Sequence, residues 1–330
     1  MSIDGREIRP ASAGNATSAD VARLAGVSRG AVSQILNGHG ARFASATRDR
    51  VLDAARVLAY EPSLAGRTLA RGRSDVVVAV VPHTTFGSNL QDILEVMTDE
   101  LARHGLMLVT RFSTSNVASF DAFIAAVQPV AVVTMAKLSD DHLHVLQTRR
   151  AQLVGAAEST EDHGVGQDVI GTLQAAHLIE RGYRQLTYAH LKDRRQNLYG
   201  QSRYAGFRAV CEQFNLPEPR VVELGIDAEE ATAVLMRFHS PGGIACYNDD
   251  VALALLFAAQ RMSLKVPDDL ALVGVDNTPI GGAVFPRLTT VGYDHAAIAN
   301  MLTGQVLSTI GVDPPARIAP DFTIIQGGTS

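Results

Sequence analysis

The chain has 330 residues, of which 46% are hydrophobic and 19% are charged, a composition that excludes a chain disordered as a whole. This length favours two or three domains. Its apolar runs are shorter than the roughly 18 residues that a membrane-spanning helix needs, and residues 1–16 lack the hydrophobic core of a signal peptide. We therefore expect a cytoplasmic protein.

Positive charge is concentrated near the amino terminus. The whole chain has a net charge of −5, yet positions 17–73 contain nine arginines against four acidic residues, and positions 74–330 are correspondingly acidic. A basic segment on an acidic protein favours nucleic acid as its partner. Charge alone leaves a second interpretation open, in which the arginines form a solvated face.

The cysteine content predicts no metal site, and we expect no cofactor. Cys211 and Cys246 fall in a predicted helix and a predicted strand. Two thiols cannot form a metal cage, and so few suit a reducing compartment. We expect both side chains to pack in the core.

A capped helix opens the first folded segment. It follows a flexible leader, residues 1–16, which mixes Gly, Pro, Ser and Ala without periodicity. Thr17 places a hydroxyl three residues before Asp20, in the manner of a capping box. The spacing predicts a short helix that ends at Gly26.

Two further helices complete this segment, which we call the head (residues 17–60). Ser28 is placed to cap a helix over Arg29–Leu36, and a third helix is predicted over Thr47–Leu58. Short helices joined by a glycine-containing turn and supported by a third are typical of a helix-turn-helix unit. We therefore expect the head to bind DNA.

Residues 61–74 form a predicted linker or hinge. The segment is short and basic, and Gly66 interrupts its weak helical tendency.

From residue 75 onward, in the body (75–330), apolar strands alternate with amphipathic helices such as Ile170–Arg181 and Val251–Met262. The predicted strands are Val76–Val81, Leu106–Thr110, Val130–Thr134, Gln152–Ala156, Gln185–Ala189, Gly243–Cys246 and Leu270–Val275. The alternation predicts an α/β fold of doubly wound parallel sheets. We expect two lobes, with crossovers near residues 165 and 292 and a ligand cleft at the carboxyl ends of the strands.

Short motifs follow one another along the head and the body. The head contains Asp20-Val-Ala-Arg-Leu-Ala-Gly-Val-Ser28, Ala31-Val-Ser-Gln-Ile-Leu-Asn37, Thr47-Arg-Asp-Arg-Val-Leu52 and Tyr60-Glu-Pro62. The body contains Gly182-Tyr-Arg184, Arg203-Tyr-Ala-Gly-Phe207, Asn248-Asp249, Val266-Pro-Asp-Asp-Leu270, Val273-Gly-Val-Asp276 and Leu288-Thr-Thr-Val291. This ordered series, from residue 17 to about 325, resembles the lactose/galactose repressor (LacI/GalR) family of bacterial transcription factors. The resemblance implies a homodimer whose heads bind pseudo-palindromic operator DNA and whose bodies, built like periplasmic sugar-binding proteins, sense a small molecule.

By this resemblance, the second predicted helix carries the base-reading residues Arg29, Gly30 and Gln34. Arg29 can pair with guanine and Gln34 with adenine through bidentate hydrogen bonds, whereas Gly30 has no side chain with which to read a base. The candidate phosphate contacts are Ser28, Ser33, Asn37 and Arg48. Surface or capping roles are the alternative for these four.

The resemblance gives the linker a second contact with DNA. In the family, the segment folds into a hinge helix on the operator, and a pair of leucines enters the minor groove. Leu69 matches that leucine, and Arg67 and Arg71 are neighbouring DNA-contact candidates. Such a wedge unstacks a base step and bends the duplex. Gly66 replaces the usual alanine, which weakens the helix, so hinge folding should depend steeply on DNA.

The resemblance also implies an effector pocket between the lobes. Its candidate residues are His83, Thr85, Phe86, Asp168, Arg203, Ile226, Asn248, Asp276 and His295. Carboxylates, an amide and a guanidinium match the donors and acceptors of a neutral polyol, so a sugar or sugar derivative is expected. A purine or nucleoside is the alternative, although Ile226 lies where relatives often carry an aromatic residue.

Other functions fit the residues less well. The segment Gly164-Val-Gly166-Gln-Asp-Val-Ile-Gly171 has Val169 where a dinucleotide fingerprint requires a small residue. Asp140-Asp-His-Leu-His144 suggests a solvated helix start more than a metal site, and adjacent aspartates cannot flank a glycosidic bond. A solute-binding protein would lack the helix-turn-helix head. We therefore expect no enzymatic activity; whether the effector induces release or acts as a corepressor stays open.

Overall fold

We describe the protein from a computed structural model, which defines residues 16–36, 40–61, 73–82, 88–136, 138–155, 166–193, 197–314 and 319–330. The chain divides into two compact units, Met1–Ser74 and Asp75–Ser330. The head lies in the first unit, and the body is the second. Among the described residues, no helix is long and apolar enough to cross a membrane.

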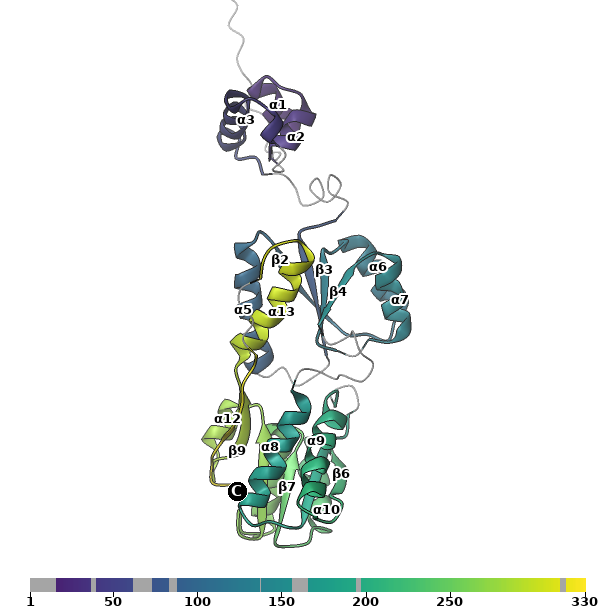
Figure 1. Cartoon of the computed structure of the whole chain (residues 1–330), viewed down its shortest axis with the longest axis vertical. Helices are drawn as coiled ribbons and strands as arrows, with labels where there is room; N and C mark the ends of the chain where they lie inside the picture. Colours follow the sequence, from purple (N-terminus) through teal and green to yellow (C-terminus); the bar gives the residue numbers. More distant parts are fainter. Residues whose placement is uncertain are drawn as a thin grey trace, which may run out of the picture. The chain divides into compact units, whose positions relative to one another are not determined.

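The head is a small helical unit with its own core. Its helices are α1 (Ser18–Ala25), α2 (Arg29–Leu36), the 3-10 helix η1 (Gly40–Arg42) and α3 (Ser45–Val57). Thr17 and Asp20 form the predicted capping box, and Gly26 ends α1 in the left-handed conformation. Val21, Val32 and Val51, one from each α-helix, are completely buried against one another. The helix-turn-helix prediction is confirmed (Figure 1).

The first lobe of the body is built on a parallel sheet in the order β2-β1-β3-β4. Its elements are β1 (Val76–Val81), α5 (Ser88–Arg103), β2 (Met107–Phe112), α6 (Val117–Val127), β3 (Ala131–Thr134), α7 (Asp140–Thr148), β4 (Gln152–Gly155) and α13 (His295–Thr309). Helices α5 and α13 cover one face of this sheet, and α6 and α7 cover the other (Figure 1). Because both faces are covered, β1 and β3 are fully apolar or nearly so, as parallel strands usually are.

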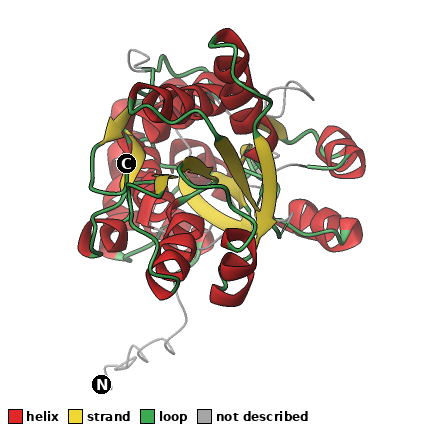
Figure 2. Ribbon diagram, turned by 90° about the horizontal axis from the view of Figure 1, so that it is seen from below, coloured by secondary structure: helices red, strands yellow, loops and turns green. Residues whose placement is uncertain are grey.

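The second lobe has a sheet in the order β10-β9-β8-β7-β5-β6. Its elements are α8 (Gln167–Glu180), β5 (Leu186–Leu191), α9 (Gly200–Gln213), β6 (Arg220–Leu224), α10 (Ala228–Leu235), β7 (Gly242–Cys246), α11 (Asp249–Arg261), β8 (Leu270–Val275), α12 (Pro279–Ala283), β9 (Thr289–Tyr293) and β10 (Phe322–Ile325). Helices α8 and α9 pack on one face, and α10 and α11 on the other. Figure 2 shows the strands in yellow surrounded by red helices.

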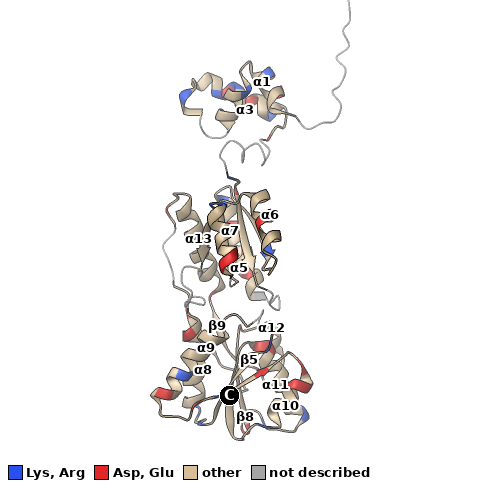
Figure 3. Cartoon of the chain, turned by 90° about the vertical axis from the view of Figure 1, so that its right-hand side faces the viewer, with Lys and Arg blue, Asp and Glu red and all other residues tan. Residues whose placement is uncertain are grey.

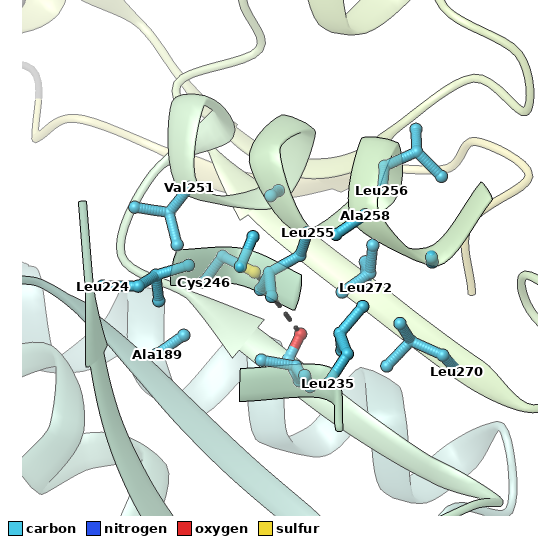
Figure 4. Close-up of a cluster of buried hydrophobic side chains, with 14 of the residues drawn as sticks. Ala189, Leu224, Leu235, Cys246, Val251, Leu255, Leu256, Ala258, Leu270 and Leu272 are labelled. Carbon is cyan, nitrogen blue, oxygen red and sulfur yellow. Dashed lines mark hydrogen bonds between the residues drawn. The ribbon is translucent and has the colours of Figure 1, made fainter. Parts of the chain in front are cut away.

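The two cysteines of this lobe lie in a helix and a strand and pack in the core, as predicted. Cys246 ends β7 beneath Val251 and Leu255 of α11, as Figure 4 shows, and it is completely buried. Cys211 lies in α9 and packs in the core on the opposite face. Burial raises the pKa of each thiol, which suits core packing rather than reactivity.

The parallel pattern predicted for the sheets does not extend to one edge of the second lobe. Strand β10 pairs with β9 in the antiparallel direction, so the chain crosses between the lobes a third time, after α13. Strand β10 is a four-residue edge strand whose residues are partly or fully exposed, and such a short edge strand gives no long apolar run in the sequence. Strands β6 and β9 are also absent from the predicted set. Strand β6 is a largely exposed edge strand, and β9 is rich in threonine.

Several boundaries differ from prediction by one to three residues. Helix α11 begins at Asp249 rather than Val251 because Asn248 caps it, its side chain accepting from the Val251 N–H at 3.1 Å. Helix α8 begins at Gln167, just after Gly166 in the left-handed conformation. Strands β1 and β8 have the predicted bounds.

Candidate DNA-binding and effector-binding sites

Helix α2 presents one face to the core of the head and the other to solvent. Ala31, Val32 and Ile35 are buried, whereas Arg29 and Gly30 are exposed at its amino end. Ser28 and Ser33 are also exposed, and Gln34 is half-buried. The proposed base-reading residues therefore share the outward face and the first turns of α2.

Two candidate phosphate contacts have structural roles in the head. The Ser28 hydroxyl accepts a hydrogen bond from the Ala31 N–H at 3.2 Å, so Ser28 caps α2 as predicted. The Arg48 guanidinium donates to the Phe43 carbonyl at 3.1 Å. It also lies beside Gly40, where an added Cβ would meet the Arg48 side chain at 3.2 Å. Arg48 thus packs against η1 and bonds to Phe43, just before α3.

Some of the predicted site residues and Gly66 lie outside the described residues. These are Asn37, Gly66, Arg67, Leu69, Arg71, His83, Thr85 and Phe86.

Arg203 is the best-fixed polar group of the candidate pocket. It is buried on α9, with 4% of its surface exposed. Its Nε donates to Gln167 Oε1 at 2.8 Å, and a terminal nitrogen donates to the Tyr247 carbonyl. The guanidinium also lies over the Tyr247 ring, 4.9 Å from its centre, and over the Tyr199 ring at 5.6 Å. A planar cation fixed in this way is a preorganised donor.

A close crossing of α8 and α9 places Arg203 next to Gln167. A Cβ on Gly171 of α8 would collide with the Arg203 carbonyl, and one on Gly206 of α9 would collide with the Asp168 carbonyl. Both helices therefore need glycine where they touch. Gly171 appears in the sequence as part of an incomplete dinucleotide fingerprint; the structure gives it a packing role instead.

Asp276 lies directly after β8 and faces the same region. Its Oδ1 accepts a hydrogen bond from the Tyr293 hydroxyl at 3.0 Å. Burial raises the pKa of the Asp276 carboxyl, and the Arg203 charge and the Tyr293 hydrogen bond partly oppose that rise. The Arg203 guanidinium and the Asp276 carboxylate lie within electrostatic range of each other, and together they could supply a donor and an acceptor to one ligand.

The remaining candidate residues have diverse surroundings. Asn248 is buried and caps α11. His295 begins α13, with Nδ1 3.4 Å from Asp92 Oδ2 and its ring edge-on to Tyr293. Asp168 is exposed in the first turn of α8, and Ile226 has 48% of its surface exposed.

The sequence interpretation missed several residues that contact this region. Tyr199, Tyr247 and Tyr293 surround Arg203 and Asp276, and Gln167 fixes the guanidinium. Tyr247 follows β7 and Tyr293 ends β9. Their places at the ends of strands are the signal that could have identified these two.

Hydrogen bonds also join the two lobes near Arg203 and Asp276. Asn89 of α5 donates to the Asp276 carbonyl at 2.7 Å and to the Tyr293 hydroxyl at 3.3 Å. The Tyr199 hydroxyl donates to the Met135 carbonyl, after β3, at 3.0 Å. Groups that surround Arg203 and Asp276 therefore also hold the lobes together.

The segment Asp140–His144 is a helix start, as predicted. Ser139 caps α7, with Asp140 and Asp141 in the first turn. His142, however, is not solvated: its ring is buried edge-on to Phe120, with 4.9 Å between centres. Across the described ranges, no group of three or more His, Cys, Asp or Glu side chains could hold a metal ion.

Comparison with known families gives one match in the head and a separate match in the body. Residues 17–63 match the family of bacterial regulatory proteins named for lacI, and residues 175–330 match a periplasmic binding protein-like domain. Among solved structures, a Lac repressor dimer bound to operator and an anti-inducer is similar with a TM-score of 0.77 at 19% identity, covering 96% of this chain and 99% of that one. A CelR regulator in complex with cellobiose has a TM-score of 0.67 at 21% identity, covering 96% of this chain and 100% of that one.

Curated relatives span nearly the whole chain. The HTH-type transcriptional regulator GntR of Pseudomonas aeruginosa is 30% identical over 329 residues, which cover 94% of each chain. The repressor PurR of Vibrio parahaemolyticus is 28% identical, covering 84% of this chain and 86% of its own. The regulator DegA of Bacillus subtilis is 27% identical, covering 82% and 85%. The chain belongs to the lacI family of bacterial regulatory proteins and is a helix-turn-helix transcriptional regulator.

Proposed function

We propose that this regulator is a cytoplasmic repressor that binds pseudo-palindromic operator DNA as a homodimer, with α2 of each head in a major groove. The observation that carries the DNA contact is the exposed amino end of α2, where Arg29 and Gly30 face solvent opposite a buried side. A recognition helix uses its amino-terminal residues to reach base edges. A twofold dimer reads two half-sites, so its operator repeats with inverted symmetry.

Selection of binding sites from a random duplex pool tests this proposal. We expect the full-length protein to enrich an inverted repeat. Enrichment of single, unrepeated sites would contradict the dimeric mode, and no enrichment over the starting pool would contradict specific DNA binding.

The effector that we propose is a small neutral molecule with several hydroxyl groups, of the sugar class, bound beside Arg203 and Asp276. Gln167 and the Tyr247 carbonyl fix the guanidinium, and Tyr293 orients the carboxylate. A hydroxyl group both donates and accepts, so neighbouring hydroxyls satisfy such a pair. The fixed Arg203 guanidinium beside Asp276 carries this proposal.

A purine is the second candidate, and the described aromatic rings give it less support. The faces of Tyr199 and Tyr247 that meet Arg203 are already covered by its guanidinium. Ile226, where a stacking residue would help, is aliphatic and exposed. A ring sandwiched between aromatic faces is therefore less well supported than a polyol.

Effector binding can change operator affinity through the hydrogen bonds that join the two lobes. A ligand beside Arg203 and Asp276 would lie among groups that bond across the lobes, including Tyr199 and Asn89. A ligand that prefers one arrangement of the lobes shifts the equilibrium toward it, and coupling to operator affinity follows by linkage.

A thermal-shift panel tests the effector class: D-ribose, D-galactose, cellobiose, D-gluconate, adenine and guanosine. A specific ligand raises the melting temperature by mass action, and we expect a neutral sugar to give the largest rise. Calorimetry then compares wild type with Arg203→Lys and Asp276→Asn, with Asp269→Asn as the matched control at the other end of β8. Loss of affinity in the first two variants alone supports the site; equal loss in all three, or none, contradicts it. Adding the hit to an operator-binding assay shows whether it induces release or acts as a corepressor.

A further inference from the structure

One buried carboxylate of the second lobe, that of Asp249, has no place in the proposed ligand contacts. Asp249, the first residue of α11, has none of its surface exposed. It accepts hydrogen bonds from the Thr278 N–H at 2.7 Å, the Thr278 hydroxyl at 2.9 Å and the Thr290 hydroxyl at 2.6 Å. This single side chain therefore connects α11 to β9 and to the start of α12.

The segment that it holds has an unfavourable backbone. Asp276 has φ of 104° and Asn277 has φ of 48°, so two consecutive non-glycine residues lie in the left-handed region. Such conformations persist where surrounding contacts determine them. Thr290, which donates to Asp249, also accepts from the Asn277 N–H at 3.2 Å. Asp249 therefore connects to the Asp276–Asn277 pair through Thr278, which follows it, and through Thr290, which bonds to Asn277.

Two glycines leave space for this carboxylate. A Cβ on Gly274 would collide with Asp249 Oδ1, and a Cβ on Gly281 would lie 3.3 Å from Oδ2. Gly274 lies two residues before Asp276. The Gly281 N–H donates to the Thr278 hydroxyl, which caps α12. The backbone on both sides of the turn is therefore fitted closely around Asp249.

The turn presents Asp276 in two directions. Its carboxylate accepts from the Tyr293 hydroxyl and interacts with Arg203, whereas its carbonyl accepts from Asn89 of the other lobe. Both contacts depend on the unusual backbone angles, because a change in φ or ψ at this residue reorients its carboxylate and its carbonyl.

We propose that Asp249 is the positioning residue of the effector site: through Thr278 and Thr290 it holds the Asp276–Asn277 turn in the conformation that directs Asp276 toward the ligand and toward Asn89. The identification of the ligand site rests on the proposed function. The holding of the turn does not, and it is measurable without any ligand.

Hydrogen exchange on the full-length protein tests the holding directly. In the wild type the amides of Asn277, Thr278 and Gly281 are bonded within this network. We expect Asp249→Asn to accelerate their exchange about tenfold or more, because an amide nitrogen would replace one acceptor oxygen. The matched control is Asp269→Asn, whose carboxylate also accepts from a backbone N–H, that of Lys265 at 2.9 Å. It should leave the turn protected.

A rescue variant separates positioning from general support of the fold. Glycine adopts the left-handed conformation without strain, so Asn277→Gly added to Asp249→Asn should restore protection of the turn. Thr290→Val and Thr290→Ser form a second pair, in which only the serine keeps the hydroxyl; this pair decides the matter if Asp249→Asn does not fold.

The effector arm uses the panel compound with the largest thermal shift. We expect Asp249→Asn to weaken its binding about tenfold, which corresponds to about 1.4 kcal/mol, and Asn277→Gly to recover most of that loss. Unchanged exchange in the turn, or acceleration spread evenly over the second lobe, would overturn the proposal. Local acceleration and rescue with no panel compound bound would support the holding of the turn and count against the proposed effector class instead.

Discussion

At the scale of single residues, Arg203 shows that a buried charged side chain requires hydrogen-bond partners. Arg203 is nearly inaccessible to solvent, and a buried guanidinium is tolerated only where hydrogen bonds replace its hydration. Gln167, the Tyr247 carbonyl and two tyrosine rings supply that replacement. The sequence identified Arg203 by resemblance. It could not reveal these partners, because Gln167 and Tyr247 approach Arg203 only once α8, α9 and β7 have packed.

His190 gives a prediction about pH. Its ring is buried on β5 beside Tyr188, and burial lowers its pKa below the usual 6.5. The unfolded chain therefore binds a proton more readily than the folded one, so stability is complete above that value and falls as the pH drops below it. We expect His190→Gln to reduce the loss of unfolding free energy between about pH 7.5 and about pH 6.

Denaturant unfolding of the two proteins at several pH values measures this slope. His239→Gln is the control, because His239 is exposed in the connection between α10 and β7, and this variant should keep the wild-type slope. An unchanged slope in His190→Gln would show that another group is responsible.

Arg29 gives a prediction about sequence readout. Its exposed position on α2 leaves its planar donors available to a guanine. Arg29→Ala should relax preference at one base pair of each half-site by about 1 to 3 kcal/mol. Arg23→Ala on α1, which removes an exposed arginine paired with Asp20, should leave the selected sequence unchanged. Site selection with both variants measures the difference, and an unaltered sequence logo for Arg29→Ala would contradict the recognition-helix assignment.

At the scale of helices and strands, the sequence predicted features that depend on neighbouring residues and missed features that depend on tertiary contacts. Thr17, Gly26 and Ser28 act through neighbours in sequence, and their capping roles are as predicted. Strand β10 depends on pairing with β9, far away in sequence, and was missed. The need for glycine at position 171 also depends on a tertiary contact, because an added Cβ would collide with the Arg203 carbonyl on another helix.

The α8–α9 crossing gives a prediction that tests this packing. Gly171→Ala places a methyl group against the Arg203 carbonyl, so the helices must separate or distort. Overpacking of this kind costs about 1 to 3 kcal/mol, and displacement of α9 should also weaken binding of the panel hit. Gly282→Ala is the matched control, because an added Cβ there has no neighbour within 4 Å in the described structure. Chemical denaturation and calorimetry on both variants measure the two effects; equal stability would contradict the close crossing.

At the scale of the whole molecule, charge separates the two functions. Figure 3 shows basic residues on the helices of the head and acidic residues on body helices such as α5, α10 and α11. The basic head attracts a polyanion, whereas the acidic body repels one. The sequence alone predicted this distribution of charge. The contacts around Arg203 and Asp276 could not be predicted in this way, because they join residues from several helices and strands of the second lobe and, through Asn89, a residue of the first lobe.

The head should make DNA binding strongly dependent on salt. Each neutralised phosphate contributes about −0.9 to the slope of log affinity against log salt concentration, so a dimer with about six such contacts has a slope near −5. Fluorescence anisotropy with the selected operator over a range of potassium chloride concentrations measures it. A slope near zero would contradict backbone contacts by the arginines of the head.

Effector binding should depend little on salt, and this difference separates a neutral effector from an anionic one. A neutral sugar exchanges no counterions, so its affinity should change less than about twofold over the same salt range. A phosphorylated ligand would meet the field of an acidic body and the Asp276 carboxylate, and the affinity of such an ion pair with Arg203 would fall as salt screens it. Calorimetry with the panel hit at low and high potassium chloride makes the comparison within one protein. Operator affinity that falls steeply while effector affinity stays level would show that the basic head and the acidic body recognise an anionic and a neutral ligand respectively; a parallel fall in both would contradict a neutral effector.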